Sequence, residues 1–339
     1  MRRKILVAII LLVNIILSCK KGDTASDPLP ENLTLKADIS TDNSGNVSFQ
    51  ANATNGATYE FDFGNGVFQT VASGNVIYKY PETGTYTVTV IAKTSKGKSA
   101  TKTLSITVSV AQRLVWSDEF DNAGAPNSAK WMYDIGAGGW GNNESQYYTN
   151  RPENAVVSNG TLKIYAIKEN YSGSAYTSAR LLTKTKFSFK YGKVEVSAKL
   201  PIGGGTWPAI WMLGNNISTV SWPACGEIDI MEHKGNTPNV IYGTLHFPGN
   251  SGGAGPSSNT TISNVSGAFH KYGLEWTATN IKISVDDVVY FTYANTNALP
   301  FNQDFFILLN VAMGGNFGGS IDPNFSTSAM EVDYVRVYQ

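Results

Sequence analysis

The sequence is short of charge and of cysteine, and both shortages exclude classes of function. Only 15% of its 339 residues are charged, and 26 basic residues balance 26 acidic ones without forming a basic stripe. That balance argues against nucleic acid as a partner. Two cysteines and three histidines are too few for a disulfide framework, and they make a thiolate zinc site improbable on ligand count alone.

A run of apolar residues long enough to cross a membrane is also missing. The apolar stretch over residues 5–17 is shorter than the ~20 residues that a membrane-spanning helix needs. It follows the basic start "MRRK", a pattern typical of a secretory signal. The "ILSC" segment that ends at Cys19 resembles the lipobox of bacterial lipoproteins, in which the signal is cleaved before an acylated cysteine. We therefore expect a signal peptide over residues 1–18, a lipidated Cys19 and a flexible tether over residues 19–32; an uncleaved N-terminal anchor is the alternative.

Acylation of Cys19 would determine where the protein resides. Several acyl chains on one cysteine hold a protein on a membrane stably, whereas one chain does so only marginally. The expected address is the bacterial cell envelope, with the protein lipid-anchored at the outer membrane on its surface or periplasmic face. The membrane, through Cys19, is then one partner.

Glycine and β-forming residues are abundant, and they indicate two β domains in series. The sequence has 33 glycines and 17 tyrosines, and Val, Ile and Thr alternate with polar residues between turns. Over residues 33–110 this period-two pattern predicts a small antiparallel sandwich. The segments "YEFDFGNG" (59–66) and "GTYTVTV" (84–90) resemble a PKD-type immunoglobulin-like domain. Because this domain lacks tryptophan, histidine and clustered titratable residues, we interpret it as a spacer rather than a binding module.

Aromatic residues of the largest kind belong to the second domain, over residues 113–339. All seven tryptophans lie at or beyond Trp116, and the segment shows many alternating strands but no long amphipathic helix. This pattern predicts one large two-sheet antiparallel sandwich. A curved sheet of that size would present a groove lined by tryptophans.

The segment "GEIDIMEHKG" (226–235) concentrates three carboxylates in an otherwise apolar run. Charged side chains rarely enter a buried strand unless they are paired or used. Glu227 and Asp229 share one face of a strand, whereas Glu232 has the opposite parity. A β-bulge near Met231 would add the one residue that returns Glu232 to the face of the other two.

Three acids on one face suit glycoside hydrolysis. A retaining glycosidase needs one carboxylate as nucleophile and a second as acid and base, ~5–5.5 Å apart. Asp229 would hydrogen-bond Glu227 and help keep a neighbouring carboxyl protonated. A solvated strand face and a hard-cation site are the alternatives, although acids nearly in line on one strand suit a cation cage poorly. The nearby tryptophans favour carbohydrate, since indoles stack on the apolar faces of sugar rings.

Residues 113–339 as a whole resemble the catalytic domain of glycoside hydrolase family 16. "EIDIME" (227–232) matches the E-x-D-x-x-E signature in the longer form of the laminarinase-like branch. Further matching motifs follow in the family's order: "LVWSDEFD", "WGNNESQYYT", "GGGTWPAIWML", "IYGTLHF", "NVAMGGNFGG" and "VDYVRVY". The resemblance implies a concanavalin-like β-jelly-roll sandwich. It also implies retaining endo-hydrolysis of β-1,3, and possibly mixed β-1,3/1,4, glucosidic bonds in laminarin-type polysaccharides.

The resemblance also assigns residues to roles. Glu227 would be the nucleophile, Glu232 the general acid and then base, and Asp229 the carboxylate that assists Glu227. The implied sugar-binding residues are Asn143, Glu144 and Arg180, which hold hydroxyls, the aromatic walls Trp207, Trp211 and Trp222, and the cleft histidine His246. Cys225 and His233 are interpreted as structural. One departure is Phe317, where laminarinase-like members usually have tryptophan.

No cofactor is implied for catalysis, but a structural calcium ion is. Family members often hold Ca²⁺ away from the groove through positions that correspond to Glu119, Gly160 and Asp333. Oxygen ligands suit calcium. Ordinary ion pairs of these acids are the alternative.

The sequence thus leads to a monomeric, envelope-anchored endo-β-1,3-glucanase with a β-glucan polysaccharide as its substrate. One alternative is a hydrolase of another β-linked polysaccharide, such as a red-algal galactan. Sulfated galactans would call for basic residues in the cleft, and the sequence shows none beside Trp207 or Trp222. Another alternative is a glucan-binding surface lipoprotein without activity, which the presence of all three acids disfavours.

Overall fold

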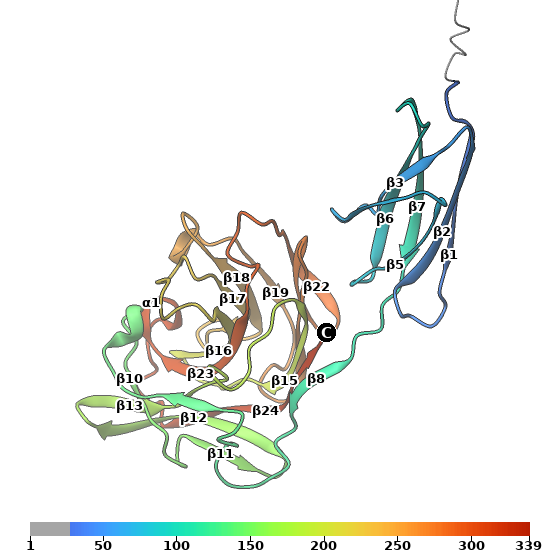
Figure 1. Cartoon of the computed structure of the whole chain (residues 1–339). Helices are drawn as coiled ribbons and strands as arrows, with labels where there is room; N and C mark the ends of the chain where they lie inside the picture. Colours follow the sequence, from blue (N-terminus) through green and yellow to red (C-terminus); the bar gives the residue numbers. More distant parts are fainter. Residues whose placement is uncertain (1–27) are drawn as a thin grey trace, which may run out of the picture. The chain divides into compact units, whose positions relative to one another are not determined.

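The computed structural model describes residues 28–339, which form two compact units with their boundary in the chain between Ala111 and Gln112. Nearly every element is a strand, and the one α-helix within the described part of the chain is the four-residue α1 (Gly315–Gly318) (Figure 1). No helix between residues 28 and 339 has the length and apolar character that a membrane span requires. The predicted signal peptide and Cys19 lie outside the described residues.

The first unit is a sandwich of two antiparallel sheets, as predicted from its alternating pattern. Buried side chains such as Val47, Phe61 and Val90 fill the space between them. The three-stranded sheet consists of β1 (Glu31–Ile39), β2 (Asn46–Thr54) and β5 (Asn75–Lys79). The four-stranded sheet consists of β4 (Phe68–Val71), β3 (Thr58–Asp62), β6 (Gly84–Lys93) and β7 (Ser99–Val108).

The predicted border between tether and first domain needs correction. β1 begins at Glu31, which pairs with Thr54, so the tether predicted over residues 19–32 ends before Glu31. The pairing is irregular between Glu31 and Thr34, where Asn32 has a φ of 54°. That irregularity interrupts the period-two pattern and hides the first two residues of the strand from sequence analysis.

The second unit packs a ten-stranded sheet against a seven-stranded sheet, and confirms the predicted large jelly-roll sandwich. The ten strands are β8 (Leu114–Asp118), β10 (Gln146–Tyr148), β11 (Ala155–Ser158), β12 (Thr161–Tyr171), β13 (Ser174–Ser178), β15 (Gly192–Lys199), β20 (His270–Trp276), β21 (Asn280–Val285), β22 (Val288–Ala294) and β24 (Thr327–Tyr338). The seven strands, in spatial order, are β19 (Ser257–Thr261), β18 (Val240–His246), β17 (Glu227–His233), β16 (Thr206–Gly214), β23 (Phe305–Met313), β14 (Arg180–Leu182) and β9 (Met132–Asp134).

The inner face of the seven-stranded sheet supplies one half of the core. Ile210, Ile228 and Leu309 point inward from it and meet residues of the ten-stranded sheet such as Val196 and Leu274. Because side chains alternate along a strand, the residues between these point to the opposite, outer face. We call this outer face of the seven-stranded sheet the site face.

Candidate active site

β17 carries a β-bulge in the predicted place. On its β16 side, Trp211 pairs with Asp229 whereas the preceding Ile210 pairs with Met231, so β17 has one extra residue in this interval. On its β18 side the pairing also shifts between Asp229 and Glu232. The expected extra residue near Met231 is therefore present, at positions 230–231.

The bulge brings Glu227, Asp229 and Glu232 to the site face together. Ile228, Ile230 and Met231, which lie between them, all belong to the core. An indole N–H is directed at each outer acid: Trp222 Nε1 donates to Glu227 Oε2 at 2.8 Å, and Trp207 Nε1 donates to Glu232 Oε1 at 3.0 Å. Two tryptophans thus hold the two carboxyl groups that glycoside hydrolysis requires.

His246 lies beside the first two acids. Its Nε2 is 3.1 Å from Asp229 Oδ2 and 3.8 Å from Glu227 Oε1. The three side chains are close enough to hold a metal ion, since one ligand atom from each lies within 4.8 Å of the others. However, Glu227 Oε2 already accepts the Trp222 N–H, so Glu227 offers only Oε1 on the side of His246. The arrangement fits an acid cluster better than a cation site.

Burial and mutual repulsion raise the pKa of every acid in the cluster. The pKa of Glu227 lies well above its ordinary value because of burial, then the charges of Asp229 and Glu232, while His246 and the Trp222 hydrogen bond oppose the rise. Burial and the charge of Glu232 likewise raise the pKa of Asp229. Burial also raises the pKa of Glu232, against the Trp207 hydrogen bond and His246. Raised pKa values of this kind favour retention of a proton within the cluster, as acid catalysis requires.

A row of cross-strand neighbours continues over the site face from Glu232. Ala209 pairs with Glu232, Asn310 with Ala209, Arg180 with Asn310 and Asp134 with Arg180. Strands lie about 4.8 Å apart, so these four steps cover about 19 Å at right angles to the strands. A chain of several sugar rings can lie along this row.

Arg180 is packed between two indoles. Its guanidinium carbon lies 4.9 Å from the ring centre of Trp140 and 4.7 Å from that of Trp211, and its Nε lies 3.0 Å from Asp134 Oδ2. Trp211 is fixed in turn, because its Nε1 donates to Asn310 Oδ1 at 2.7 Å. Arg180 and Trp211 therefore form one rigid group on the site face.

The loop that carries Asn143 and Glu144 is tied to the sheet and to α1. The Glu144 carboxylate accepts hydrogen bonds from Asn142 Nδ2, Gln146 Nε2 and the Tyr148 hydroxyl, at 3.2, 2.6 and 3.2 Å. Asn143 is exposed, and its Nδ2 donates to Asn316 Oδ1 of α1 at 2.8 Å. Glu144 thus organises the loop, while Asn143 stays accessible to a ligand.

Several residues of the site face were missed in the sequence. Asn310 links Trp211 to Tyr148, whose hydroxyl accepts from Asn310 Nδ2 at 3.0 Å. The sequence held a signal for it, because Asn310 is the one polar residue in the buried strand "FFILLNVAM". Asp134 carried no such signal, and Trp140 stood at the start of the matching motif "WGNNESQYYT" without a role, since only the fold places both against Arg180.

A basic side chain does lie close to Trp207, contrary to the expectation from sequence. The ammonium of Lys234 lies over the rings of Tyr242 and Phe317, at 5.1 and 4.9 Å from their centres, and Phe317 contacts Trp207. Lys234 comes directly after β17, far in sequence from the Trp207 motif. Pairing of β16 with β17 brings the two together.

The residues predicted to bind calcium are close in topology but are a poor match to the ion. β8 and β12 both pair with β24, which brings Glu119 and Gly160 to the neighbourhood of Asp333. The Glu119 carboxylate is occupied on both oxygens by the Arg336 guanidinium, at 3.1 and 2.8 Å, and Asp333 accepts from the Ser197 hydroxyl. This set offers fewer free oxygens than the six to eight that Ca²⁺ takes.

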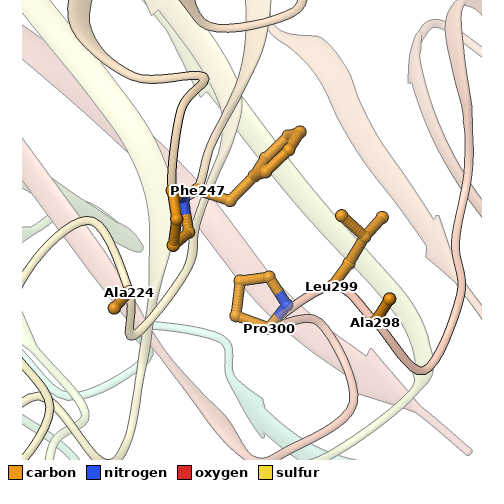
Figure 2. Close-up of a pocket in the computed structure, with 6 residues that line it drawn as sticks. Ala224, Phe247, Ala298, Leu299 and Pro300 are labelled. Atoms are coloured by element: carbon orange, nitrogen blue, oxygen red, sulfur yellow. The ribbon is translucent and has the colours of Figure 1, made fainter.

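Two of the pockets in the second unit have linings that do not include the three acids. The larger, of about 310 Å³, has an apolar lining of Ala224, Phe247, Pro248, Ala298, Leu299 and Pro300 (Figure 2). The smaller, of about 150 Å³, lies on the site face beside Asp134 and Arg180. Cys225 is buried and unpaired, and His233 is buried with its pKa lowered to about 4, so both are structural as expected.

Comparison with known proteins agrees with this geometry. The family model "Glycosyl hydrolases family 16" matches residues 142–336, and a PKD domain model matches residues 27–108. A β-glucanase of Rhodothermus marinus is 45% identical over 242 residues, covering 67% of this chain and 85% of that protein.

Solved structures give the same result. The laminarinase of Rhodothermus marinus superimposes with a TM-score of 0.65 and 45% identity, over 68% of this chain and 98% of that one. The laminarinase catalytic domain of Thermotoga maritima MSB8 gives a TM-score of 0.64 and 43% identity, over 67% and 98%. The chain therefore belongs to glycosyl hydrolase family 16, with a PKD domain ahead of the catalytic domain.

Proposed function

We propose that this protein is a retaining endo-β-1,3(4)-glucanase that cuts internal glucosidic bonds of laminarin-type polysaccharides. The observation that carries the proposal is the bulged strand β17, which presents Glu227, Asp229 and Glu232 on one face with an indole donor on each outer acid. The row of polar residues that crosses the sheet from Glu232 suits a long glycan rather than a small substrate.

In the proposed reaction the Glu227 carboxylate attacks the anomeric carbon. Glu232 donates its proton to the glycosidic oxygen, so that one product leaves and a glycosyl ester on Glu227 remains. Glu232, now ionised, removes a proton from water, which hydrolyses the ester with net retention. Trp222 and His246 favour the charged form of Glu227, as a nucleophile requires. Asp229, between the two, raises the pKa of Glu227 in the free enzyme.

The remaining site residues receive binding roles in this proposal. Arg180 and Asn143 donate to sugar hydroxyls, while Glu144 keeps the Asn143 loop in place. Trp222 is 45% exposed and presents a ring face to a sugar beside Glu227. Trp207 and Trp211 act differently, as a hydrogen-bond donor to Glu232 and as a support for Arg180.

A product profile on four polysaccharides tests the function. Laminarin and lichenan are expected to yield oligosaccharides of several lengths, with the new reducing end first released in the β configuration. Agarose and carrageenan are expected to remain uncut. Release of only monosaccharide, a first product in the α configuration, or preferential cutting of a galactan would contradict the proposal.

The cellular location of the protein and a structural calcium ion are two further proposals. We propose that acylated Cys19 anchors a monomeric enzyme to the bacterial cell envelope, on the strength of the "ILSC" motif. Replacing Cys19 with Ala should move the protein from the detergent phase to the aqueous phase on partition, with activity retained. Calcium at Glu119, Gly160 and Asp333 stays a prediction, which a fall in melting temperature on chelation would support.

A further inference from the structure

Beside the acids, the site face carries a cation, Lys234, for which the described part of the chain provides no hydrogen-bond acceptor. The Lys234 ammonium lies over the rings of Tyr242 and Phe317. In the part of the chain that the structure describes, it forms no hydrogen bond and no ion pair. By contrast Lys199, which also lies over a ring, that of Phe269, has Glu331 as its partner at 3.1 Å. Lys234 thus keeps its donors available.

Its position relative to the acid Glu232 is fixed by packing. Tyr242 pairs with Glu232 across β18 and β17, so both side chains lie on the site face. Phe317, from α1, contacts the Trp207 ring at 5.3 Å between centres, and Trp207 donates to Glu232. The two rings that carry the Lys234 ammonium are therefore the direct neighbours of the acid and of its donor.

The turn that carries Lys234 is fixed by hydrogen bonds to the segment around α1. Asn236 Nδ2 donates to the backbone oxygens of Gly318 and Ser320, at 2.6 and 3.1 Å, so the turn after β17 is bound to α1. The cation therefore does not depend on a flexible loop for its placement. An ammonium on aromatic faces is attracted by the rings and keeps its three N–H groups for other acceptors.

We infer that Lys234 is a substrate-binding residue of this enzyme, which donates hydrogen bonds to hydroxyls of the sugar next to Glu232 on a platform of Tyr242 and Phe317. The inference rests on the proposed glucanase function and specifies a further contact of the same site. The ligand is a neutral sugar rather than a sulfated one, because Lys234 lies beside Glu232, and Glu232 shares the site face with Glu227 and Asp229, which would repel a sulfate. A second effect accompanies binding, since the positive charge favours the ionised form of Glu232 that acts as base in the second half of the reaction.

The groups that act electrostatically on Glu232 come from several elements. Trp207 on β16, His246 and Thr244 on β18, and Lys234 after β17 all lower its pKa. Glu232 in turn raises the pKa of Glu227 and Asp229 on β17 and of Tyr290 on β22. Lys234 thus opposes the rise in the pKa of Glu232 that burial causes. Its removal should therefore shift the alkaline limb of the pH profile upward.

Lys234→Met tests the inference, because methionine keeps the apolar contact with both rings and loses charge and donors. With soluble laminari-oligosaccharides we expect KM to rise about 5–10-fold while kcat changes less than about 2-fold, the pattern of a lost ground-state contact. The alkaline limb of kcat/KM should move up by about 0.5 pH units. Lys234→Arg, which keeps charge and donors, should restore most of the affinity.

Lys190→Met is the matched control, since Lys190 lies over the Tyr191 ring in the same unit and away from the site face. It should leave KM and the pH profile unchanged. An unchanged KM and alkaline limb in Lys234→Met would overturn the inference, as would equal losses in Lys234→Met and Lys234→Arg. If the unsubstituted enzyme hydrolysed no glucan, the proposed function itself would be refuted. Failure of the inference about Lys234 and failure of the proposed function can therefore be distinguished.

Discussion

Among single residues, Glu227 and Glu232 show how one strand can supply two acids with different tasks. Both are half-buried, and the resulting loss of solvation raises the pKa of both. Their partners differ, because Glu227 faces His246 and Trp222 while Glu232 accepts from Trp207 and lies near Lys234. Such unequal surroundings separate the nucleophile from the acid.

Replacing Glu227 with Gly should lower hydrolysis of laminarin by about 10³-fold or more, because the attacking carboxylate is removed. Added azide should then enter the vacated space and give a glycosyl azide of inverted configuration. The measurement is product analysis by NMR with and without azide. Glu275→Gly, at an exposed carboxylate of β20, is the control and should retain full activity. Ordinary retained turnover in Glu227→Gly would contradict the nucleophile role.

Replacing Asp229 with Asn should move the acid limb of kcat/KM to lower pH. The Asp229 charge raises the pKa of Glu227, so its removal lowers that pKa and leaves Glu227 ionised in more acidic solution. The reaction needs ionised Glu227, and activity should extend downward accordingly. A pH profile on soluble oligosaccharides measures the shift. An acid limb that stays in place or moves upward would refute the coupling.

The sequence predicted the three acids but not every residue of the site. The three carboxylates stood out because they interrupt an apolar run. Asn310 gave the same kind of signal more weakly, as one polar residue in a buried strand. Lys234 and Asp134 gave none, since an exposed charge in a turn or at a strand end is ordinary, and only the pairing of distant strands brings them to the site face.

At the scale of elements, the bulge in β17 decides which side chains reach the substrate. Without it, Glu232 would take the inward direction that Met231 now has, and His233 would take the outward one. The prediction of the bulge succeeded because parity alone demanded an extra residue. The start of β1 was misplaced for the opposite reason, because an irregularity there removed the pattern.

Deleting Met231 should remove the bulge and still leave Glu232 on the site face, because Glu227, Asp229 and the shifted Glu232 then alternate regularly along the strand. The deletion variant should therefore keep measurable hydrolysis, while loss of the fully buried Met231 side chain should destabilise the second unit by about 2–5 kcal/mol. Met231→Leu keeps the bulge and nearly the same volume, so it should cost less than about 1.5 kcal/mol and preserve hydrolysis. Urea unfolding and laminarin hydrolysis measure both variants. A folded deletion variant without any hydrolysis would show that the bulge itself, and not only the parity of the three acids, is required.

At the scale of the whole molecule, the two units divide structure from chemistry. Every residue assigned to the site lies at or beyond Asp134, within the second unit, and that unit has a core of its own. The sequence predicted this division from the distribution of tryptophan and of alternating segments. It did not reveal which strands would be neighbours, because pairing between distant segments leaves no local pattern.

A chain that begins at Gln112 should thus fold and hydrolyse soluble laminari-oligosaccharides with kcat/KM within about 2-fold of the full chain, since it keeps the complete core and site. Calorimetry of this shorter chain should show an unfolding transition at the same temperature as one of the transitions of the full chain. A fall in kcat/KM of tenfold or more would mean that the PKD domain takes part in turnover of small substrates.

The place of β23 in the seven-stranded sheet has a consequence for biosynthesis. This strand separates β16 from β14, although its residues 305–313 come near the end of the chain. Until residues 305–313 have been synthesised, the hairpin of β16 and β17, which carries the acids, lacks the strand that places it beside Arg180. A nascent chain that has not reached residue 313, or an enzyme truncated before residue 305, should therefore be inactive, and hydrolysis should begin only after this strand has been made.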